Sequence, residues 1–339
     1  MENIYNKTID GLEEYFLSIG EKKFKAIQVF EWLYQKRIKT FSDMSNIKKD
    51  VIEKLSSDFS IERLNVVKVE RDVEVNKYLF ELTDKEHVET VLMRHDYGLS
   101  LCISSQVGCN MGCRFCESGR LKKVRNLTAA EMVLQILQVE EDIKNRISHV
   151  VVMGIGEPFD NYDNIVNFIK IINNAKGIAL GSRHITISTC GVVPGIEKFM
   201  LEKGQVNLAI SLHAPNDEIR NKIMPISKRY SLEELMNVIR KYIDVTNRRV
   251  TFEYIMLDGV NDSEDAALEL SKLLRGINCY VNLIPYNETE NIEFKRTKND
   301  QIMKFYDILK KNRINVTIRK EFGSKVDAAC GQLRANQEL

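Results

Sequence analysis

The feature that most constrains the fold is a regular alternation of short β-rich runs with helical stretches, which starts near residue 100. The helical stretches include LTAAEMVLQILQVEEDI and SLEELMNVIRKYI, whose apolar residues recur at helical spacing. The β-rich runs are LCISSQ, HVVVMG, HITIST, VNLAISLH, VTFEYIML, YVNLIPY and NVTIRK. This alternation is typical of βα units with a parallel sheet. Because six or seven units do not complete an eight-stranded barrel, the pattern predicts an α/β fold with a partial (β/α)6-type TIM barrel.

The first ninety or so residues follow a different pattern. Apolar residues recur at helical spacing in EKKFKAIQVFEWLYQKRI, whereas NVVKVERDVEVNKYLFELTDKEHVETVLM is typical of short strands separated by polar turns. We therefore predict two domains. Residues 1–94 form an N-terminal α+β accessory domain, and residues 95–339 form the core, which ends in a segment with the last cysteine.

The composition indicates an ordinary globular protein, because 44% of the residues are hydrophobic and 29% are charged. No apolar run approaches the roughly 20 residues that cross a bilayer, and the start, MENIYNKTIDGLEEYF, lacks the regions of a signal peptide. We expect a cytoplasmic protein, in which clustered cysteines are more often metal ligands or catalytic thiols than disulfides. The net charge of +1 neither requires nor excludes a nucleic-acid partner.

Four of the seven cysteines lie within fifteen residues, in the stretch LCISSQVGCNMGCRFC. One interpretation is a structural zinc site with the four thiolates of Cys102, Cys109, Cys113 and Cys116. The seven-residue gap after Cys102 is unusual for a zinc motif, however, and the other three form C-x3-C-x2-C by themselves. Three thiolates at this spacing can hold three irons of a four-iron cluster and leave the fourth open to a ligand.

A second motif, MGIGEP, follows the β-rich run HVVVM. Gly154 and Gly156 let the backbone approach a ligand closely, and Glu157 supplies a carboxylate for an ammonium group. A dinucleotide-binding fingerprint is excluded, because Phe159 stands where its third glycine is required. Thr128 and Glu131 have capping-box spacing and predict that a helix begins after the cysteine loop. The cysteine motif and the MGIGEP motif therefore both follow predicted strands, at the end of the barrel where active sites lie.

A C-x3-C-x2-C loop after the first barrel strand, with a GxGEP turn about one βα unit later, resembles the radical S-adenosyl-L-methionine (SAM) superfamily. From about Phe24 to Leu333 the chain further resembles the RlmN RNA adenine methyltransferases, with the Cfr resistance methyltransferases as near relatives. Glu117, Cys190 and Glu288 depart from the residues that are usual in the family, but they remove no expected ligand or catalytic thiol. The matching blocks, in family order, are FEWLYQKRIKTFSDMSN, VETVLMRHDYG, SSQVGC, VRNLT, MGIGEPFDN, RHITIST, AISLHAPN, VNLIPYN and VDAACGQL.

The resemblance implies a 4Fe-4S cluster on Cys109, Cys113 and Cys116. In the superfamily the open iron chelates the amino and carboxylate groups of SAM, and an electron from the cluster cleaves SAM to a 5′-deoxyadenosyl radical. Taken alone, His213 is more typical of a structural histidine, so its assignment rests on the resemblance. The implied SAM-binding residues are Gly156, Glu157, Ser188, Ser211, Leu212, His213 and Asn287.

The resemblance also implies two SAM molecules per turnover and three catalytic residues, Cys330, Cys102 and Glu89. Cys330 takes a methyl group from one SAM, which requires a thiolate. After the methyl carbon has been joined to adenine, Cys102 helps to release the product, and the two sulfurs end as a disulfide that must be reduced. Glu89 matches the candidate proton acceptor, although by itself it is typical of an exposed strand residue. Cys190 and Cys279 have no implied role, and buried strand cysteines explain them.

The implied substrates are carbon 2 of an adenine in 23S rRNA and of an adenine next to the anticodon of tRNA, with the N-terminal domain as a candidate for RNA binding. Cfr-type methylation of carbon 8 is the alternative, which VTIRKEFG slightly favours. A zinc-stapled RNA-binding protein without catalysis is the alternative of a different class. We expect a monomer with an unidentified electron donor. The candidate phosphate-binding residues are Arg120, Lys122, Lys123 and Arg125, and, in the N-terminal region, Lys36, Arg37 and Lys39.

Overall fold

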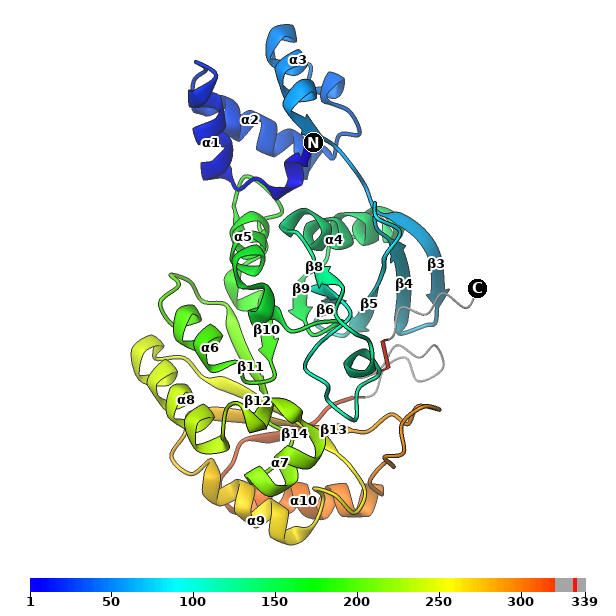
Figure 1. Ribbon diagram of the computed structural model, residues 1–339, viewed down its shortest axis with the longest axis vertical. Coiled ribbons are helices and arrows are strands. Elements are labelled where there is room, and N and C mark those ends of the chain that lie inside the picture. The colour runs from blue at the N-terminus through cyan, green and yellow to red at the C-terminus, as the bar shows by residue number, and fades with distance from the viewer. Residues whose placement is uncertain (321–331, 334–339) are drawn as a thin grey trace.

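The computed structural model describes residues 1–320 and 332–333. A helical N-terminal part lies at one end of an elongated molecule, above an open barrel (Figure 1). The N-terminal part is held together by a short parallel pair of strands, which joins its first residues to the end of its last helix. Its elements are β1 (Glu2–Asn3), α1 (Ile9–Ser18), α2 (Phe24–Glu31), α3 (Lys49–Asp58) and β2 (Phe59–Ser60).

One ten-stranded sheet forms the rest of the framework, in the order β14-β13-β12-β11-β10-β9-β6-β5-β4-β3. Within this sheet, the three strands that come first in the sequence are antiparallel: β3 (Asn65–Arg71), β4 (Val75–Glu81) and β5 (His87–His95). The other seven run parallel to one another: β6 (Gly98–Ile103), β9 (His149–Val152), β10 (Ile185–Thr189), β11 (Asn207–Ser211), β12 (Val250–Met256), β13 (Cys279–Pro285) and β14 (Val316–Ile318). Within the described residues β3 and β14 are edges, so the barrel is open.

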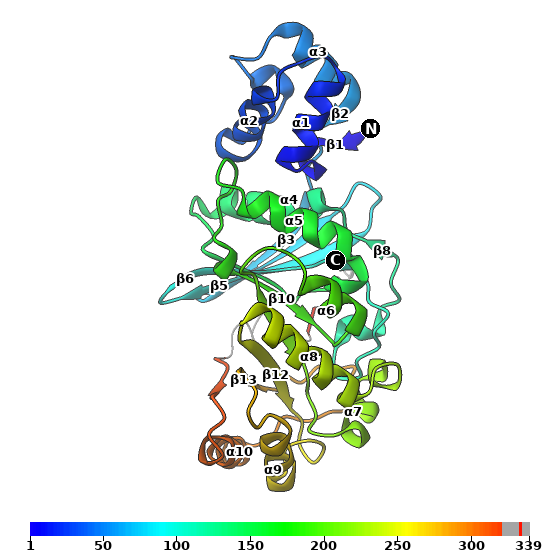
Figure 2. The same ribbon diagram turned by 90° about the vertical axis from the view of Figure 1, so that its left-hand side faces the viewer.

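Helices connect the parallel strands and cover the outside of the curved sheet (Figure 2). This arrangement confirms the predicted partial (β/α)6-type barrel, with β14 added after the sixth unit. In the described part of the chain no helix is long and apolar enough to cross a membrane. The connecting helices are α4 (Ala129–Ile143), α5 (Tyr162–Asn173), α6 (Val193–Phe199), α7 (Asp217–Ile223), α8 (Leu232–Thr246), α9 (Glu264–Leu273) and α10 (Asn299–Lys311).

Local sequence explains where these elements begin and which way they face. The predicted capping box opens α4, because Thr128 Oγ1 accepts from Glu131 N at 3.2 Å and Glu131 Oε2 accepts from Thr128 N at 2.8 Å. In β10, Ile185 and Ile187 are fully buried, while alternate residues are only half-buried. The period of two therefore places apolar side chains under the helices and polar ones toward the barrel interior.

The predicted domain boundary between residues 94 and 95 falls inside β5. β5 pairs with β6, which in turn pairs with β9, so the antiparallel strands continue into the barrel sheet without a break. The helical N-terminal part contacts α4, where Asn6 Oδ1 accepts from Ala130 N at 2.8 Å and Arg37 forms an ion pair with Glu140. The division into two domains stays a prediction.

Candidate active site

The cysteine loop lies between two short strands, β7 (Gln106–Val107) and β8 (Arg125–Asn126), that pair with each other. The loop is anchored across the barrel, because Arg114 N donates to Ile223 O at the end of α7 with a distance of 2.9 Å. Phe115 packs with Ile223 and other apolar residues of that side. The loop therefore covers the C-terminal end of the barrel strands.

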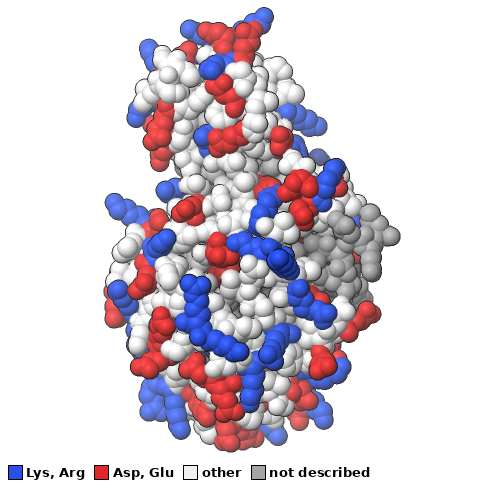
Figure 3. All heavy atoms as spheres, in the orientation of Figure 1, with Lys and Arg blue, Asp and Glu red and all other residues white. Residues whose placement is uncertain are grey.

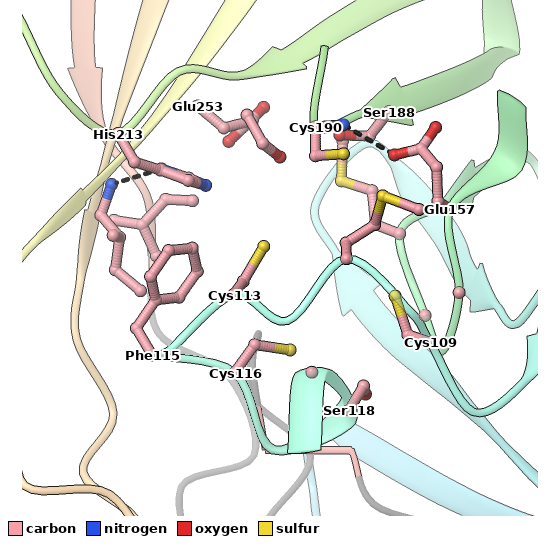
Figure 4. A pocket seen from close by; sticks show the side chains of 18 of the residues that line it. Cys109, Cys113, Phe115, Cys116, Ser118, Glu157, Ser188, Cys190, His213 and Glu253 are labelled. Carbon is pink, nitrogen blue, oxygen red and sulfur yellow. Dashed lines mark hydrogen bonds between the residues drawn. The ribbon is translucent and has the colours of Figure 1, made fainter. Parts of the chain in front are cut away.

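Three of its cysteines face one open cavity of about 870 Å³ under the loop. Figure 4 shows the thiols of Cys109, Cys113 and Cys116 pointing into the same space, with Glu157 and His213 on opposite sides of it. Burial raises the pKa of Cys109 to about 12 and raises the pKa of Cys113 well above its ordinary value. These thiols need a bound cation to be stable as thiolates.

The residues around the cavity fit a 4Fe-4S cluster. Three soft thiolate donors from one loop suit an iron–sulfur site. Arg220 is fully buried nearby, with Nη2 donating to Cys190 O at 2.7 Å and Nε donating to Leu212 O at 3.2 Å. Its Nη1 has no hydrogen-bond partner among the described residues. The guanidinium favours the thiolate of Cys113 and would compensate the negative charge of a cluster held by three thiolates.

Cys102 is separated from the other three cysteines of the motif. It lies on β6, opposite Val91 of β5, and packs in an apolar cluster with Val91, Met93, Ile155 and Leu333. A four-thiolate zinc site would need all four sulfurs about 2.3 Å from one ion. In residues 1–320 and 332–333, no three His, Cys, Asp or Glu side chains are arranged to hold a single metal ion.

The GxGEP turn forms the wall beside the cysteine loop. Gly156 has a φ of +111°, and a Cβ at this position would lie 2.6 Å from Cβ of Gln106. Glu157 is 3% exposed, and its oxygens accept from Cys190 N at 2.8 Å and from Phe159 N at 2.9 Å. Burial raises the pKa of Glu157, while these backbone donors oppose the increase. Each carboxylate oxygen keeps acceptor capacity for an ammonium group in the cavity.

His213 supplies a neutral donor on the opposite wall. Its backbone has a φ of +59°, and Nδ1 accepts from Ile255 N at 3.0 Å. Burial, with a smaller contribution from Arg220, lowers the pKa of His213 to about 3. The ring is therefore neutral with its proton on Nε2. Ser188 and Ser211 add hydroxyl groups to the cavity lining.

Two of the predicted SAM-binding residues do not line the cavity with their side chains. Leu212 is fully buried, and its backbone N donates to Glu253 O at 3.1 Å. Asn287 is half-buried and follows the end of β13. The other five, Gly156, Glu157, Ser188, Ser211 and His213, line it. Their roles in binding SAM stay predictions.

Glu89 lies on β5, on the face of the sheet that carries Val91 and Cys102. It is 5% exposed, which differs from the exposed position typical of its sequence. Lys77 of β4 places Nζ 3.5 Å from Glu89 Oε1 and 3.0 Å from Glu70 Oε2. Sequence reasoning missed Lys77, although a lysine within the apolar strand VNKYLFE is a signal for a buried ion pair.

Cys330 lies outside the described residues. The nearest described residues after it in the sequence are Gln332 and Leu333. Leu333 packs in the apolar cluster of Cys102, and its carbonyl oxygen accepts from Ser118 Oγ at 2.6 Å. Leu333 is therefore anchored between Cys102 and the cysteine loop.

Three of the seven basic residues proposed from sequence form ion pairs with acidic partners; Arg37 is one of them. Arg125 forms ion pairs with Glu131 and Asp84, and Lys123 forms one with Asp160. On the face shown in Figure 3, basic and acidic side chains are interspersed. Sequence reasoning missed Glu253, which lines the cavity from β12. Its signal was a single acidic residue inside the apolar run VTFEYIML.

Comparison with known proteins agrees with this geometry. Residues 2–61 match the ribosomal RNA large subunit methyltransferase N-terminal domain, and residues 103–271 match the radical SAM superfamily. A probable dual-specificity RNA methyltransferase RlmN of Enterococcus faecalis is 55% identical, covering 99% of this chain and 97% of the relative. One from Listeria monocytogenes is 53% identical, covering 99% of this chain and 94% of the relative.

A solved structure is similar over the full length. The crystal structure of a radical SAM methyltransferase from Sphaerobacter thermophilus has a TM-score of 0.93 and 40% sequence identity, covering 99% of this chain and 100% of that one. These likenesses support an enzyme over a zinc-stapled binding protein. Radical SAM proteins use a 4Fe-4S cluster and SAM. The chain therefore belongs to the RlmN family of SAM-dependent radical RNA methyltransferases.

Proposed function

We propose that this enzyme methylates carbon 2 of an adenosine at the peptidyl-transferase centre of 23S rRNA and of the adenosine 3′ to the anticodon in tRNA. The methyl group travels on Cys330, and two SAM molecules are used in each turnover. The observation that carries the proposal is the pair of adjoining regions: a three-cysteine cavity and, beside it, the buried cluster of Cys102 and Leu333. We place the reaction in the cytoplasm, with a monomeric enzyme and an electron donor still to be identified.

The cavity residues divide the work of holding the cofactors. Cys109, Cys113 and Cys116 would hold the cluster, and Glu157 would accept a hydrogen bond from the amino group of SAM. His213 would donate from Nε2. When bound, the cluster and SAM supply the methyl group and a 5′-deoxyadenosyl radical able to remove one hydrogen from it.

The two catalytic thiols and Glu89 would complete the reaction. The Cys330 thiolate takes the methyl group by displacement, and its carbon is later joined to carbon 2 of adenine. Glu89 would accept the proton that leaves carbon 2, and Lys77 Nζ lies 3.5 Å from Glu89 Oε1. The Cys102 thiolate then attacks the Cys330 sulfur. A disulfide forms, the carbon–sulfur bond breaks, and the released carbon takes up a proton to become the product methyl group. The one unpaired electron that the radical brought to the adduct would return to the cluster.

A thiol reductant must restore the two cysteines before the next turnover. Leu333 supports this pairing, because it follows Cys330 by three residues and packs in the same cluster as Cys102.

Mass spectrometry of RNA from cells with and without the gene tests the proposed target. We expect 2-methyladenosine in 23S rRNA and tRNA only when the gene is present. Finding 8-methyladenosine instead would show Cfr-type chemistry. Finding 2-methyladenosine in rRNA but not in tRNA would remove tRNA from the proposal.

A further inference from the structure

A second cavity, of about 1920 Å³ and open to solvent, lies at the N-terminal ends of the barrel strands. It adjoins the cavity under the cysteine loop, because Met153, Glu253 and Arg319 line both. The two cavities together make the interior of the barrel hollow from the N-terminal end to the cysteine loop.

Small polar side chains explain the hollow interior. TIM-barrel interiors are ordinarily filled by branched apolar residues. Here the inward positions of β10 to β13 include Thr186, Ser188, Asn207, Ser211, Thr251 and Asn282. These side chains leave space and offer hydrogen-bond donors and acceptors, which suits a polar, planar guest such as a nucleobase.

The outer rim of the second cavity carries uncompensated positive charge. Arg183 and Arg248 donate to neutral partners, Gln205 Oε1 at 2.8 Å and Asn207 Oδ1 at 2.9 Å, and Arg249 lies over a tyrosine ring. Within the part of the chain that the structure describes, none of the three arginines forms an ion pair. This differs from the paired Arg125 and Lys123 beside the cysteine loop. Guanidinium groups of this kind bind phosphates.

An aromatic row lies on the same rim. Tyr97 is 65% exposed and stacks on His95 with ring centroids 4.6 Å apart and planes 11° apart. The rings of His149 and Tyr97 form a T-shaped pair with centroids 5.1 Å apart. Tyr97 and His95 both line the second cavity. Exposed aromatic rings beside arginines are the surface on which unpaired RNA bases stack.

The opposite end of the barrel is covered by the cysteine loop, which is anchored to α7 through Arg114 N and Ile223 O. In the described residues, the second cavity gives a base a route into the interior from the N-terminal ends of the strands. That route leads to Cys102, because Met93, Val151 and Met153 line the second cavity and pack against the cluster that contains Cys102.

Glu253 stands where the two cavities meet. It is 4% exposed, and among the described residues that line the second cavity it is the only acidic one. Its Oε1 accepts from Asn282 Nδ2 at 3.0 Å, while Oε2 has no hydrogen-bond partner in residues 1–320 and 332–333. A buried carboxylate oxygen without a partner is costly, so a ligand that brings a donor is favoured there.

We propose that the target adenine enters through this N-terminal mouth, with its flanking phosphates on Arg183, Arg248 and Arg249, and donates from its exocyclic amino group to Glu253. Glu253 is then a specificity-determining residue. The inference rests on the proposed function, because it takes adenine in RNA as the substrate.

A cycle that combines a protein change with an RNA change tests the role of Glu253. The RNAs are two stem-loops with either adenine or purine, which lacks the amino group, at the target position. We expect the wild-type holoenzyme to prefer adenine in kcat/KM by about tenfold or more, as sites built around a buried hydrogen bond do. Glu253→Ala should lose this preference and methylate both RNAs at the lower rate.

SAM cleavage without RNA is the control for this cycle, because Glu253 also borders the cofactor cavity. A SAM contact of Glu253 would lower SAM cleavage and the methylation of both RNAs by the same factor and would keep the preference for adenine, a result that would overturn the proposal. If the alanine variant does not fold, Glu253→Gln is tested in its place. Its preference for the adenine RNA over the purine RNA should fall below that of the wild type. A wild-type preference in the variant that folds would also overturn the proposal.

The arginines are tested by the salt dependence of RNA binding to the holoenzyme. Replacing Arg183, Arg248 and Arg249 by Ala should reduce the slope of log affinity against log salt by about 2, as expected when three contacts to single-stranded phosphates are lost. The control replaces Arg240 and Lys241 by Ala on the exposed face of α8 and should leave the slope unchanged. An unchanged slope in the rim variant would overturn the proposed mouth.

The two proposals fail in distinguishable ways. If the wild type methylates carbon 8, the proposed function is wrong, while the adenine-to-purine cycle still measures the contact with Glu253. If the wild type methylates carbon 2 and the cycle shows no coupling, only the role of Glu253 is wrong.

Discussion

The cysteines of the motif serve two separate regions of the barrel. Cys109, Cys113 and Cys116 line the cavity under their loop, whereas Cys102 packs among aliphatic side chains on β6. Sequence spacing predicted the first group, because a short loop limits how far apart its thiols can lie. The surroundings of Cys102 could not be predicted in the same way, because they come from β5 and from Leu333, far away in the sequence.

Cys113→Ala should lose the iron–sulfur cluster and all methyl transfer, because two remaining thiolates are too few to hold it. Iron and acid-labile sulfide, measured after anaerobic purification, check the result. The control is Cys279→Ala, which removes a buried thiol of the barrel core and should keep full iron content. Full iron content in Cys113→Ala would count against the assigned ligand set.

Cys102→Ala should stall after carbon 2 of adenine has been joined to Cys330, because the thiol that breaks the carbon–sulfur bond is missing. Protein purified from cells should then carry covalently bound RNA, visible as a slow band that disappears on nuclease treatment. Cys279→Ala should show no such band and should lose only about 1 to 3 kcal/mol of stability, as a small cavity does. A Cys102→Ala protein with a full cluster and no RNA would refute this role.

Lys77→Met should slow methylation by about tenfold or more, because Glu89 then stays buried without the ion-pair partner that holds its carboxyl group in position. SAM cleavage without RNA should stay unchanged, which separates this effect from unfolding. The matched control is Lys68→Met, since Lys68 is exposed and pairs only with Glu70. Equal methylation rates for wild type and Lys77→Met would show that Glu89 does not need the ion pair.

At the scale of elements, the period of the sequence predicted the parallel strands and the capped start of α4. It did not predict that β5 and β6 join the N-terminal strands to the barrel sheet, because a change of pattern near residue 95 suggested a boundary there. Glu253 was missed because it lies inside an apolar strand, and nothing local shows which face of that strand is hollow.

Gly156→Ala should weaken SAM binding strongly, because the added Cβ would lie 2.6 Å from Cβ of Gln106. The side chain of Gln106 also accepts from Glu157 N at 2.8 Å, so its displacement would shift Glu157. Gly259→Ala is the control, because Gly259 also has a positive φ, of +67°, but its Cβ would meet nothing within 4 Å. It should cost about 1 to 2 kcal/mol of stability and leave SAM binding unchanged. Calorimetric titration with SAM compares the two variants. Equal SAM affinities for Gly156→Ala and Gly259→Ala would contradict the role given to Gly156.

At the scale of the whole molecule, the barrel is covered at one end and open at the other. The cysteine loop is anchored over the C-terminal ends of the strands, and the basic rim surrounds the N-terminal mouth. The helical N-terminal part contacts α4 and lies at the far end of the molecule from α9 and α10 (Figure 1). In our proposal the cofactors bind under the cysteine loop, the RNA base enters at the opposite mouth, and the two meet near Cys102 and Glu253.

The central claim is that the methyl group reaches carbon 2 of adenine by way of Cys330 and loses one of its hydrogens on the way. The direct measurement uses SAM with a fully deuterated methyl group and mass spectrometry of the methylated RNA. The account predicts 2-methyladenosine whose methyl group carries two deuterium atoms and one hydrogen from solvent. A methyl group with all three deuterium atoms would show direct transfer from SAM and would contradict the account.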